Sequence, residues 1–240
     1  MIPQLTTSPL NRADGSATYT TSLFSILAAV NGPVEVQRRD ELPEEAAIEV
    51  NLRPGSGAGG PRERWLESIV ASMLRSVLLV HLHPRTLVQV TLQVVKEPGA
   101  PFRKGRGDVA VLPSLINAAF LALVDGGLPL ETTMSAALVA VSTNGELLRE
   151  PSVKDLLACK SVHAMAFDMQ GEMLLDQSTG DFDVDTWEKV VDLAQQSCVG
   201  AIASAGEDES MANGGADDEP WLRQALEGKV RKSNAWREQT

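Results

Sequence analysis

The stretch from Pro54 to Val80 constrains the fold of this chain more than any other. Its apolar residues recur at the three- and four-residue spacing of a helix that buries one face; they are Trp65, Leu66, Ile69, Val70, Met73, Leu74, Val77 and Leu78. The opposite face is polar, and Pro61 suits a first helical turn, where its missing N–H needs no partner. We therefore expect an amphipathic helix from Pro61 onward, with the rest of the chain packed around it.

The glycine-rich segment GSGAGG at 55–60 precedes this helix, and Arg62 follows it directly. Backbone N–H groups and the helix dipole converge at such a position, which favours an anion. The segment lacks the Gly-Lys-Ser/Thr ending that reaches nucleotide phosphates and magnesium, so a nucleoside-triphosphatase loop is excluded. Two interpretations stay open here: an anion contact at Arg62, or a plain connection with a solvated arginine.

The composition limits the classes of function. The 240 residues carry a net charge of −11, which argues against a dedicated nucleic-acid binder. Two clusters at 207–209 and 217–219 hold six of the 32 acidic residues, so the remainder is closer to neutral. We find no apolar run that approaches bilayer length and no secretory signal, and we expect a soluble intracellular protein without a membrane partner.

The few cysteines and histidines do not suggest a metal site. Cys159 and Cys198 are too far apart for a metal knuckle, and we expect two buried structural thiols. His81 and His83 lie two residues apart without further ligands nearby, which favours exposed side chains in a connection. We therefore expect neither a metal nor another cofactor.

The order of elements predicts an α+β fold in which the sequence of strands and helices repeats once along the chain. Alternating or β-branched patterns predict strands, and helical periods predict helices. The expected strands occupy 16–33 (two strands or one bent hairpin), 47–53, 86–95, 134–142, 146–149, 161–168 and 172–177; the expected helices after the first occupy 112–125, 152–158 and 183–199.

Four segments fall outside this pattern. Residues 1–11 are expected to form an irregular arm, residues 200–219 a disordered acidic linker, and residues 220–240 a C-terminal helix. Residues 96–109 are expected to form a basic loop insertion whose cations either meet phosphates or remain solvated; they include Arg103, Lys104 and Arg106.

Several phrases are specific enough to indicate a family. They are ADGSA (13–17), VNGPVEVQRRDELPEEAAIEV (30–50), RERWLESIV (62–70), QVTLQVV (89–95) and INAAFLALVDGGLPL (116–130). The chain resembles the RNase PH superfamily over about residues 10–199, and within it the RNase PH-like ring subunits of the eukaryotic RNA exosome.

This resemblance implies an RNase PH-like fold of the ribosomal protein S5 domain 2-like type over residues 12–199. That fold has two βαβα-type halves with mixed sheets and packed helices. It further implies a heterodimer within a hexameric ring around a channel for single-stranded RNA, together with cap subunits and an associated catalytic nuclease. The implied locations are the nucleus and nucleolus, and also the cytoplasm.

Active members of the family cleave RNA from its 3′ end with inorganic phosphate, held by arginines and a Gly-Thr-Arg turn beside paired aspartates. By the resemblance, Arg62 matches the first phosphate-binding arginine. The Gly-Thr-Arg turn falls on Ala110, Val111 and Leu112, which offer neither hydroxyl nor guanidinium. Asp155 matches the first aspartate only with a one-residue gap, and the second falls on Ser161 or Val162.

Because a leucine cannot bind phosphate, we expect a degenerate site and a non-catalytic ring subunit that supports 3′-to-5′ RNA processing and degradation, including rRNA maturation and mRNA turnover. Candidate contacts to RNA phosphates are Arg38, Arg39, Arg62, Arg103, Lys104 and Arg106. The alternatives are an active phosphate-dependent 3′-to-5′ exoribonuclease, a hydrolytic nuclease acting through Asp155, and a free-standing homodimer.

Overall fold

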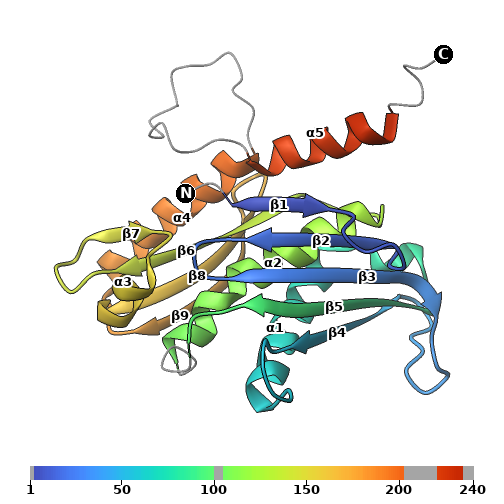
Figure 1. The fold of residues 1–240 in the computed structure, drawn as a ribbon, viewed down its shortest axis with the longest axis horizontal. Coiled ribbons are helices and arrows are strands. Elements are labelled where there is room, and N and C mark those ends of the chain that lie inside the picture. Colours follow the sequence, from blue (N-terminus) through green and yellow to red (C-terminus); the bar gives the residue numbers. More distant parts are fainter. Residues whose placement is uncertain (1–2, 100–104, 203–220, 235–240) are drawn as a thin grey trace.

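Two β-sheets enclose one apolar helix in this protein (Figure 1). The computed structural model describes residues 3–99, 105–202 and 221–234. The first sheet has the order β1-β2-β3-β5-β4, and its strands are β1 (Gln4–Thr7), β2 (Gly15–Thr20), β3 (Ser25–Glu35), β4 (Ala47–Arg53) and β5 (Thr86–Lys96). Its pairs are antiparallel except β4 with β5, which is parallel.

The second sheet is antiparallel throughout and has the order β7-β6-β8-β9. Its strands are β6 (Met134–Val141), β7 (Leu147–Arg149), β8 (Ser161–Asp168) and β9 (Met173–Gly180). The helices are α1 (Pro61–Val77), α2 (Arg106–Asp125), α3 (Val153–Ala158), α4 (Val184–Ile202) and α5 (Trp221–Asn234), with a short 3-10 turn at Val80–Leu82. The α+β class expected from the sequence is confirmed.

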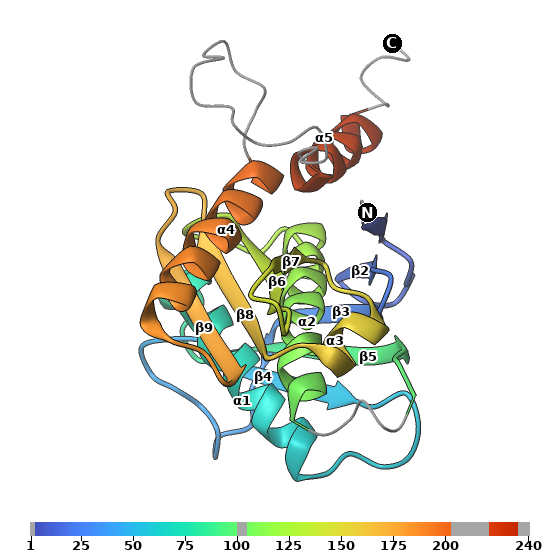
Figure 2. The ribbon, with the colours of Figure 1, turned by 90° about the vertical axis from the view of Figure 1, so that its left-hand side faces the viewer.

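The organising element is α2 rather than α1. Helix α2 packs against β2 and β3 on one side and against β6 and β8 on the other (Figure 2), and 16 of its 20 residues are buried. The expectation that the chain packs around the 54–80 stretch is therefore wrong. A helix buried on all sides has no polar face, so it lacks the amphipathic period that made α1 conspicuous.

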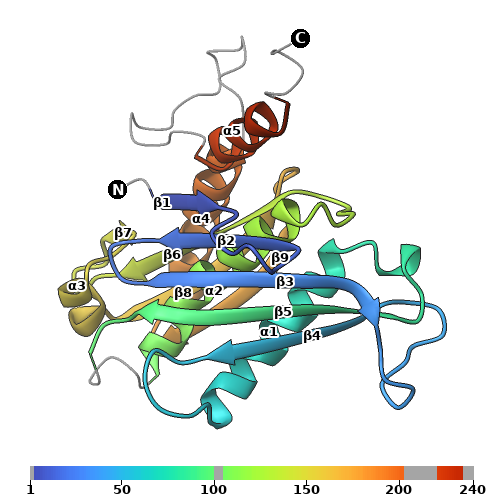
Figure 3. The ribbon, with the colours of Figure 1, turned by 45° about the vertical axis from the view of Figure 1, so that its right-hand side comes forward.

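Helix α1 covers the same side of the first sheet, next to β4 and α2. Figure 3 shows the first sheet from its other side, with the helices behind the strands. Leu66, Val70 and Leu74 bury the apolar stripe of α1, whereas Trp65 at its edge is 42% exposed. Among the described elements, the helices thus lie on one face of the first sheet and leave the other face without a helix.

The start of α2 corrects the loop predicted for residues 96–109. The helix begins at Arg106, six residues before its predicted start, and Pro113 lies inside it. The predicted start at Leu112 is therefore wrong, because the mainly small and aliphatic residues 107–111 continue the helix into the core. The remaining loop includes Arg103 and Lys104, which lie outside the described residues.

Helix α2 is also the one described helix long and apolar enough to cross a membrane by length and composition, with a mean hydropathy of 1.8. The expectation that no apolar run approaches that length is therefore wrong for this stretch. Within the protein, 89% of its apolar window is buried. The two sheets account for this burial, because they contact opposite sides of the helix.

The arm predicted for residues 1–11 is wrong in part, because Gln4–Thr7 form the edge strand β1. This strand pairs with β2 in the register Gln4 to Thr20 and Thr7 to Ala17. A four-residue edge strand is held by backbone hydrogen bonds to the neighbouring strand, so its sequence needs little apolar alternation. Only Leu5 of β1 packs against the core.

The last segments follow the second sheet. Helix α4 packs on the face of β6 and β8 opposite α2 and buries Val190, Ala194 and Cys198 there. It continues to Ile202, so the predicted linker at 200–219 falls mostly on residues outside the described part of the chain. Within the segment 220–240, where a helix was expected, α5 runs from Trp221 to Asn234.

Candidate functional site

The predicted phosphate ligand Arg62 lies in the first turn of α1, between the end of β4 and the start of α2. Its Nε donates to Oδ1 of Asp108 in the first turn of α2. Its Nη1 lies 3.5 Å from Oε1 of Glu63. The other oxygen of Glu63 accepts a 2.8 Å hydrogen bond from the Gly60 N–H, so this carboxylate is fixed at the helix start.

These contacts neutralise the guanidinium from within the protein. Asp108 and Glu63 occupy the first turns of α2 and α1, where a helix dipole favours negative charge. A phosphate that approached Arg62 would meet two carboxylates and would have to displace Asp108. In this structure Arg62 joins two helix starts.

The three residues at the predicted Gly-Thr-Arg position lie inside α2 and not in a turn. Ala110, Val111 and Leu112 are 1%, 3% and 0% exposed and belong to the main core. Leu112 is among the largest fully buried side chains of the protein. This segment therefore points into the core and presents no donor to an anion.

Asp155 has a structural partner. It is the third residue of α3, and its Oδ2 accepts hydrogen bonds from the Ser152 N–H at 2.9 Å and the Ser152 hydroxyl at 2.6 Å. The hydroxyl bond and then the backbone bond hold the pKa of this exposed carboxyl below its usual value. This is a capping box, in which a carboxylate stabilises a helix start.

The two residues proposed for the second aspartate are buried in β8. Val162 faces the main core and is 0% exposed. Ser161 is also 0% exposed, and its hydroxyl lies 2.9 Å from Nε2 of His163. Neither side chain can supply a carboxylate.

The candidate RNA contacts divide into two groups. Arg106 starts α2, two residues before Asp108, and its Nη2 donates to the Lys160 carbonyl at 3.4 Å; it therefore lies at the same end of the sheet as Arg62. Arg38 and Arg39 precede β4, whereas Arg62 follows it (Figure 3). The seven residues of β4 span about 20 Å, and the two groups lie in the segments that enter and leave this strand.

The exposed pair Arg39 and Asp40 is joined at 3.2 Å between Nε and Oδ1, so one cation of the second group has an acidic neighbour. The four described candidates for RNA contact thus form two small groups, one before and one after β4 in the chain.

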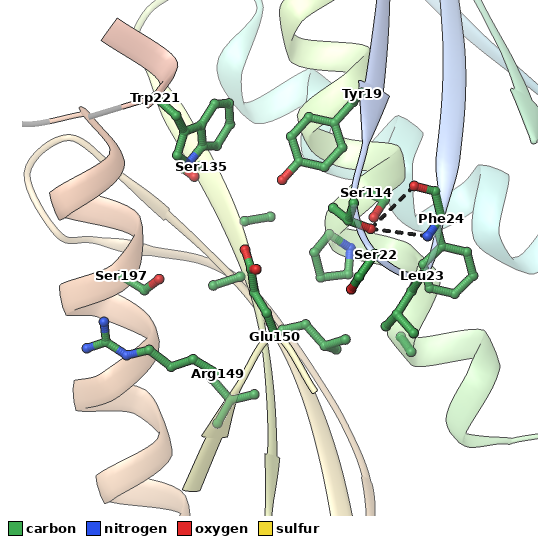
Figure 4. A pocket seen from close by; sticks show the side chains of 17 residues that line it. Tyr19, Ser22, Leu23, Phe24, Ser114, Ser135, Arg149, Glu150, Ser197 and Trp221 are labelled. Atoms are coloured by element: carbon green, nitrogen blue, oxygen red, sulfur yellow. Dashed lines mark hydrogen bonds between the residues drawn. The ribbon is translucent and has the colours of Figure 1, made fainter. Parts of the chain in front are cut away.

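A small cavity lies where the two sheets, α4 and α5 meet (Figure 4). Its volume is about 70 Å³, and hydroxyl groups of Tyr19, Ser114 and Ser135 line it together with Trp221 and Glu150. The backbone of Glu150 has a φ of 46°, which is uncommon for a residue other than glycine. The cavity is too small for a nucleotide, because it holds the volume of about two water molecules.

A polar group that no motif in the sequence indicated links β8, β9 and α4, and its centre, His163, is buried. His163 bonds Ser178 Oγ through Nδ1 at 2.8 Å, and Ser178 donates to Asp176 Oδ1 at 2.7 Å. Since an ionised carboxylate only accepts, the oxygen of Ser178 accepts from Nδ1–H, and Nε2 accepts from the Ser161 hydroxyl. Trp187 of α4 donates to the other Asp176 oxygen at 3.0 Å.

The predicted structural thiols are both buried and free. Burial raises the pKa of Cys159 and raises that of Cys198 to about 12, so both remain protonated thiols. Within the described ranges, no group of three or more His, Cys, Asp or Glu side chains is arranged to hold a metal ion.

Comparison with known proteins identifies related chains. Residues 3–129 match the family model RNase_PH, described as "3' exoribonuclease family, domain 1". The chain is 32% identical over 199 residues to the exosome complex component RRP46 of Saccharomyces cerevisiae, which covers 79% of this chain and 86% of the yeast protein. It is 35% identical over 162 residues to the exosome complex exonuclease RRP46 homolog of Oryza sativa subsp. japonica, covering 68% of this chain and 64% of the rice protein.

Two solved structures share the fold. The crystal structure of rice Rrp46 superposes with a TM-score of 0.70 at 29% identity, over 82% of this chain and 88% of that chain. A structure of the Archaeoglobus fulgidus exosome with RNA bound to the active site has a TM-score of 0.64, over 81% of this chain and 84% of that chain. At 15% identity, this second likeness shows the fold alone.

Proposed function

Because the chain belongs to the RNase PH family of 3′ exoribonucleases, we propose that it is a non-catalytic structural subunit of an exosome-type hexameric ring. In this role it supports 3′-to-5′ RNA processing and degradation, including rRNA maturation and mRNA turnover. The observation that carries the proposal is Leu112, which lies fully buried where the resemblance expects a phosphate-binding arginine.

The geometry around Arg62 supports the same conclusion. Phosphorolysis needs an anionic nucleophile positioned by fixed cationic donors. Here the retained arginine is engaged by Asp108 and Glu63, and Ala110 and Val111 are packed in the core. Loss of a charge-assisted clamp is worth several kcal/mol of transition-state stabilisation, or about a thousandfold in rate.

The relatives are named as exosome proteins, which supports exosome partners, and the specific partners proposed here are those that the family resemblance implies. They are other RNase PH-like ring subunits, cap subunits, an associated catalytic nuclease and single-stranded RNA. Arg62 with Arg106, and Arg38 with Arg39, are the described candidates for contacts to RNA phosphates; Arg103 and Lys104 are candidates from the sequence alone. The proposed location is the nucleus and nucleolus, and also the cytoplasm.

One observation favours a second candidate function. The rice relative is named an exonuclease, so a phosphate-dependent 3′-to-5′ exoribonuclease is the alternative. The two functions differ in their products, because phosphorolysis releases nucleoside diphosphates only when inorganic phosphate is present.

The test uses the full chain, alone and assembled with ring subunits. We expect neither sample to release more nucleoside diphosphate than a control ring whose other RNase PH-like subunits have been inactivated. Native mass measurement should show that the chain assembles with the ring subunits. Phosphate-dependent release by the isolated chain would establish the alternative instead. Charge reversal of Arg38 and Arg39 together, compared with Arg62 and Arg106 together, then tests which group contributes to RNA protection by the assembled ring.

A further inference from the structure

The C-terminal helix α5 is fixed to the body of the protein at two points. At its start, the ring of Trp221 lies 5.5 Å from that of Tyr19 and tilts by 54°, and Leu222 is 1% exposed in the main core. Two turns later, Nζ of Lys229 donates to the carbonyls of Val124 and Asp125 at the end of α2, at 2.8 Å to the first.

The second point forms a socket for one ammonium group. The last carbonyls of a helix lack partners within it and carry its negative dipole end. Oδ1 of Asp125 lies 3.3 Å from the same Nζ, and the Asp125 side chain is only 5% exposed. The three donors of a lysine ammonium thus meet three oxygen atoms.

The socket also joins the first two strands to α2. Asp125 accepts hydrogen bonds from the Ser8 hydroxyl at 2.8 Å and from the Ser16 N–H at 2.9 Å. The hydrogen bonds from Ser16 and Ser8 and the contact with Lys229 together lower the pKa of Asp125 despite the opposing effect of burial. Removing Lys229 therefore weakens the support of β1 and β2 as well as that of α5.

The position of α5 matters because β1 is an edge strand. In Figures 1 and 3 the helix extends alongside β1, and the two elements are in contact. An uncovered edge strand is a template for pairing with another chain, and covering it with a helix prevents this. Trp221 at the same time forms part of the wall of the cavity beside Tyr19 (Figure 4).

Helix α5 has little reason to be stable when it is not docked. It has 14 residues, a length at which isolated helices are marginal in water. Gly228 lies within it, and a Cβ added there would meet no other atom within 4 Å. Glycine therefore lowers the stability of the helix here, although the surrounding space would accept a side chain.

We propose that α5 is a detachable guard helix. It docks in cis through the Lys229 socket and the Trp221–Tyr19 contact, and when it leaves, the edge of β1 is open to pairing with β1 of a second copy. The socket thus binds Lys229 of the same chain, and the helical structure of α5 depends on this docking.

Hydrogen exchange of the full-length chain, read by mass spectrometry, tests this proposal. Lys229→Gln is compared with Arg231→Gln, because Arg231 is a neighbouring cation whose side chain is 84% exposed. We expect Lys229→Gln to speed exchange in residues 4–7 and 221–234 about tenfold and to increase self-association at high concentration. Arg231→Gln should leave exchange and self-association unchanged, and Gly228→Ala should slow exchange in α5 about fivefold.

The outcomes separate clearly. Equal effects of Lys229→Gln and Arg231→Gln would show that the socket does not hold α5 and would overturn the proposal. Faster exchange in α5 with unchanged exchange in β1 and no self-association would overturn the guard role. A chain that stays folded by circular dichroism, with changes confined to β1, α5 and the end of α2, supports it.

Discussion

Arg62 at the start of α1 donates from its Nε to Oδ1 of Asp108 at the start of α2, so one ion pair joins the two helix N-termini. Both side chains are 23% exposed, which leaves the pair partly accessible to water. An arginine that the family resemblance assigns to phosphate thus serves here as a link between helices. The partner lies 46 residues away in the sequence.

This link predicts a measurable coupling. We expect Arg62→Gln and Asp108→Asn each to lower the free energy of unfolding by about 1 kcal/mol, since the pair is partly exposed and Asp108 also faces the α2 dipole. The double variant should lose little more than either single variant. Urea unfolding of the four proteins measures this, with Arg75→Gln, from the more exposed pair with Glu45, as the control. Strictly additive losses would show that the pair contributes nothing.

Restoring the missing arginine should damage the fold before it restores chemistry. Leu112→Arg places a guanidinium at a position with 0% exposure, and burying an unpaired charge costs several kcal/mol. We expect an unstable or insoluble protein, whereas Leu112→Met should cost less than about 1.5 kcal/mol. Soluble yield and urea midpoints compare the two. A stable Leu112→Arg protein with phosphate-dependent activity would contradict both this prediction and the proposed function.

The capping box of α3 predicts a structural effect at Asp155. We expect Asp155→Asn or Ser152→Ala to lower the urea midpoint of unfolding, because each removes hydrogen bonds at the helix start. RNA protection by the assembled ring should stay unchanged. A variant that keeps its stability but loses an RNA-dependent activity of the ring would instead assign Asp155 a role in chemistry.

The buried His163 predicts a pH dependence. Burial lowers its pKa below the usual 6.5, although the nearby Asp176 opposes this. The unfolded chain therefore binds a proton more readily than the folded protein, so stability is full above about pH 6.5 and falls as the pH drops from there toward the folded pKa. Urea midpoints between pH 8 and pH 5 should show this decline.

His163→Gln provides the control, because it removes the titrating ring while keeping polar atoms near Ser161 and Ser178. Its stability should be lower at pH 8 but flat down to about pH 5. The hydrogen-bonded acids Asp155, Asp183 and Glu227 have lowered pKa values and lose their contributions only around pH 4 and below. A wild-type chain with no change between pH 7 and pH 5 would refute the role of His163.

The sequence was sufficient wherever burial follows a regular period. The alternation in 86–95 predicted β5, and the apolar stripe after Pro61 predicted α1. The sequence did not predict the start of α2 or the strand β1. A fully buried helix has no alternation of apolar and polar faces, and an edge strand is held mainly by backbone pairing with its neighbour.

At the candidate functional site, the sequence predicted which residues occupy the family's phosphate-site positions but not what those residues contact. The resemblance placed Arg62, Asp155 and Leu112, but no spacing connects Arg62 with Asp108 or Lys229 with Asp125, which the fold alone brings together. The burial of Leu112 was likewise not predicted, since the expected helix began at this residue, whereas the structure places it inside a longer helix.

The double-sided burial of α2 also has a consequence for synthesis on the ribosome. β2 and β3 are already made when α2 emerges, whereas β6 and β8, which cover its other side, come from residues 134–168. Until those residues leave the exit tunnel, the nascent chain presents a long apolar helix with one side bare, a state prone to aggregation. A pause in translation after α2 has left the tunnel, but before residues 134–168 have done so, would prolong that exposure, so chaperone binding to the nascent chain should be strongest at this stage and should end once β8 has paired with β6.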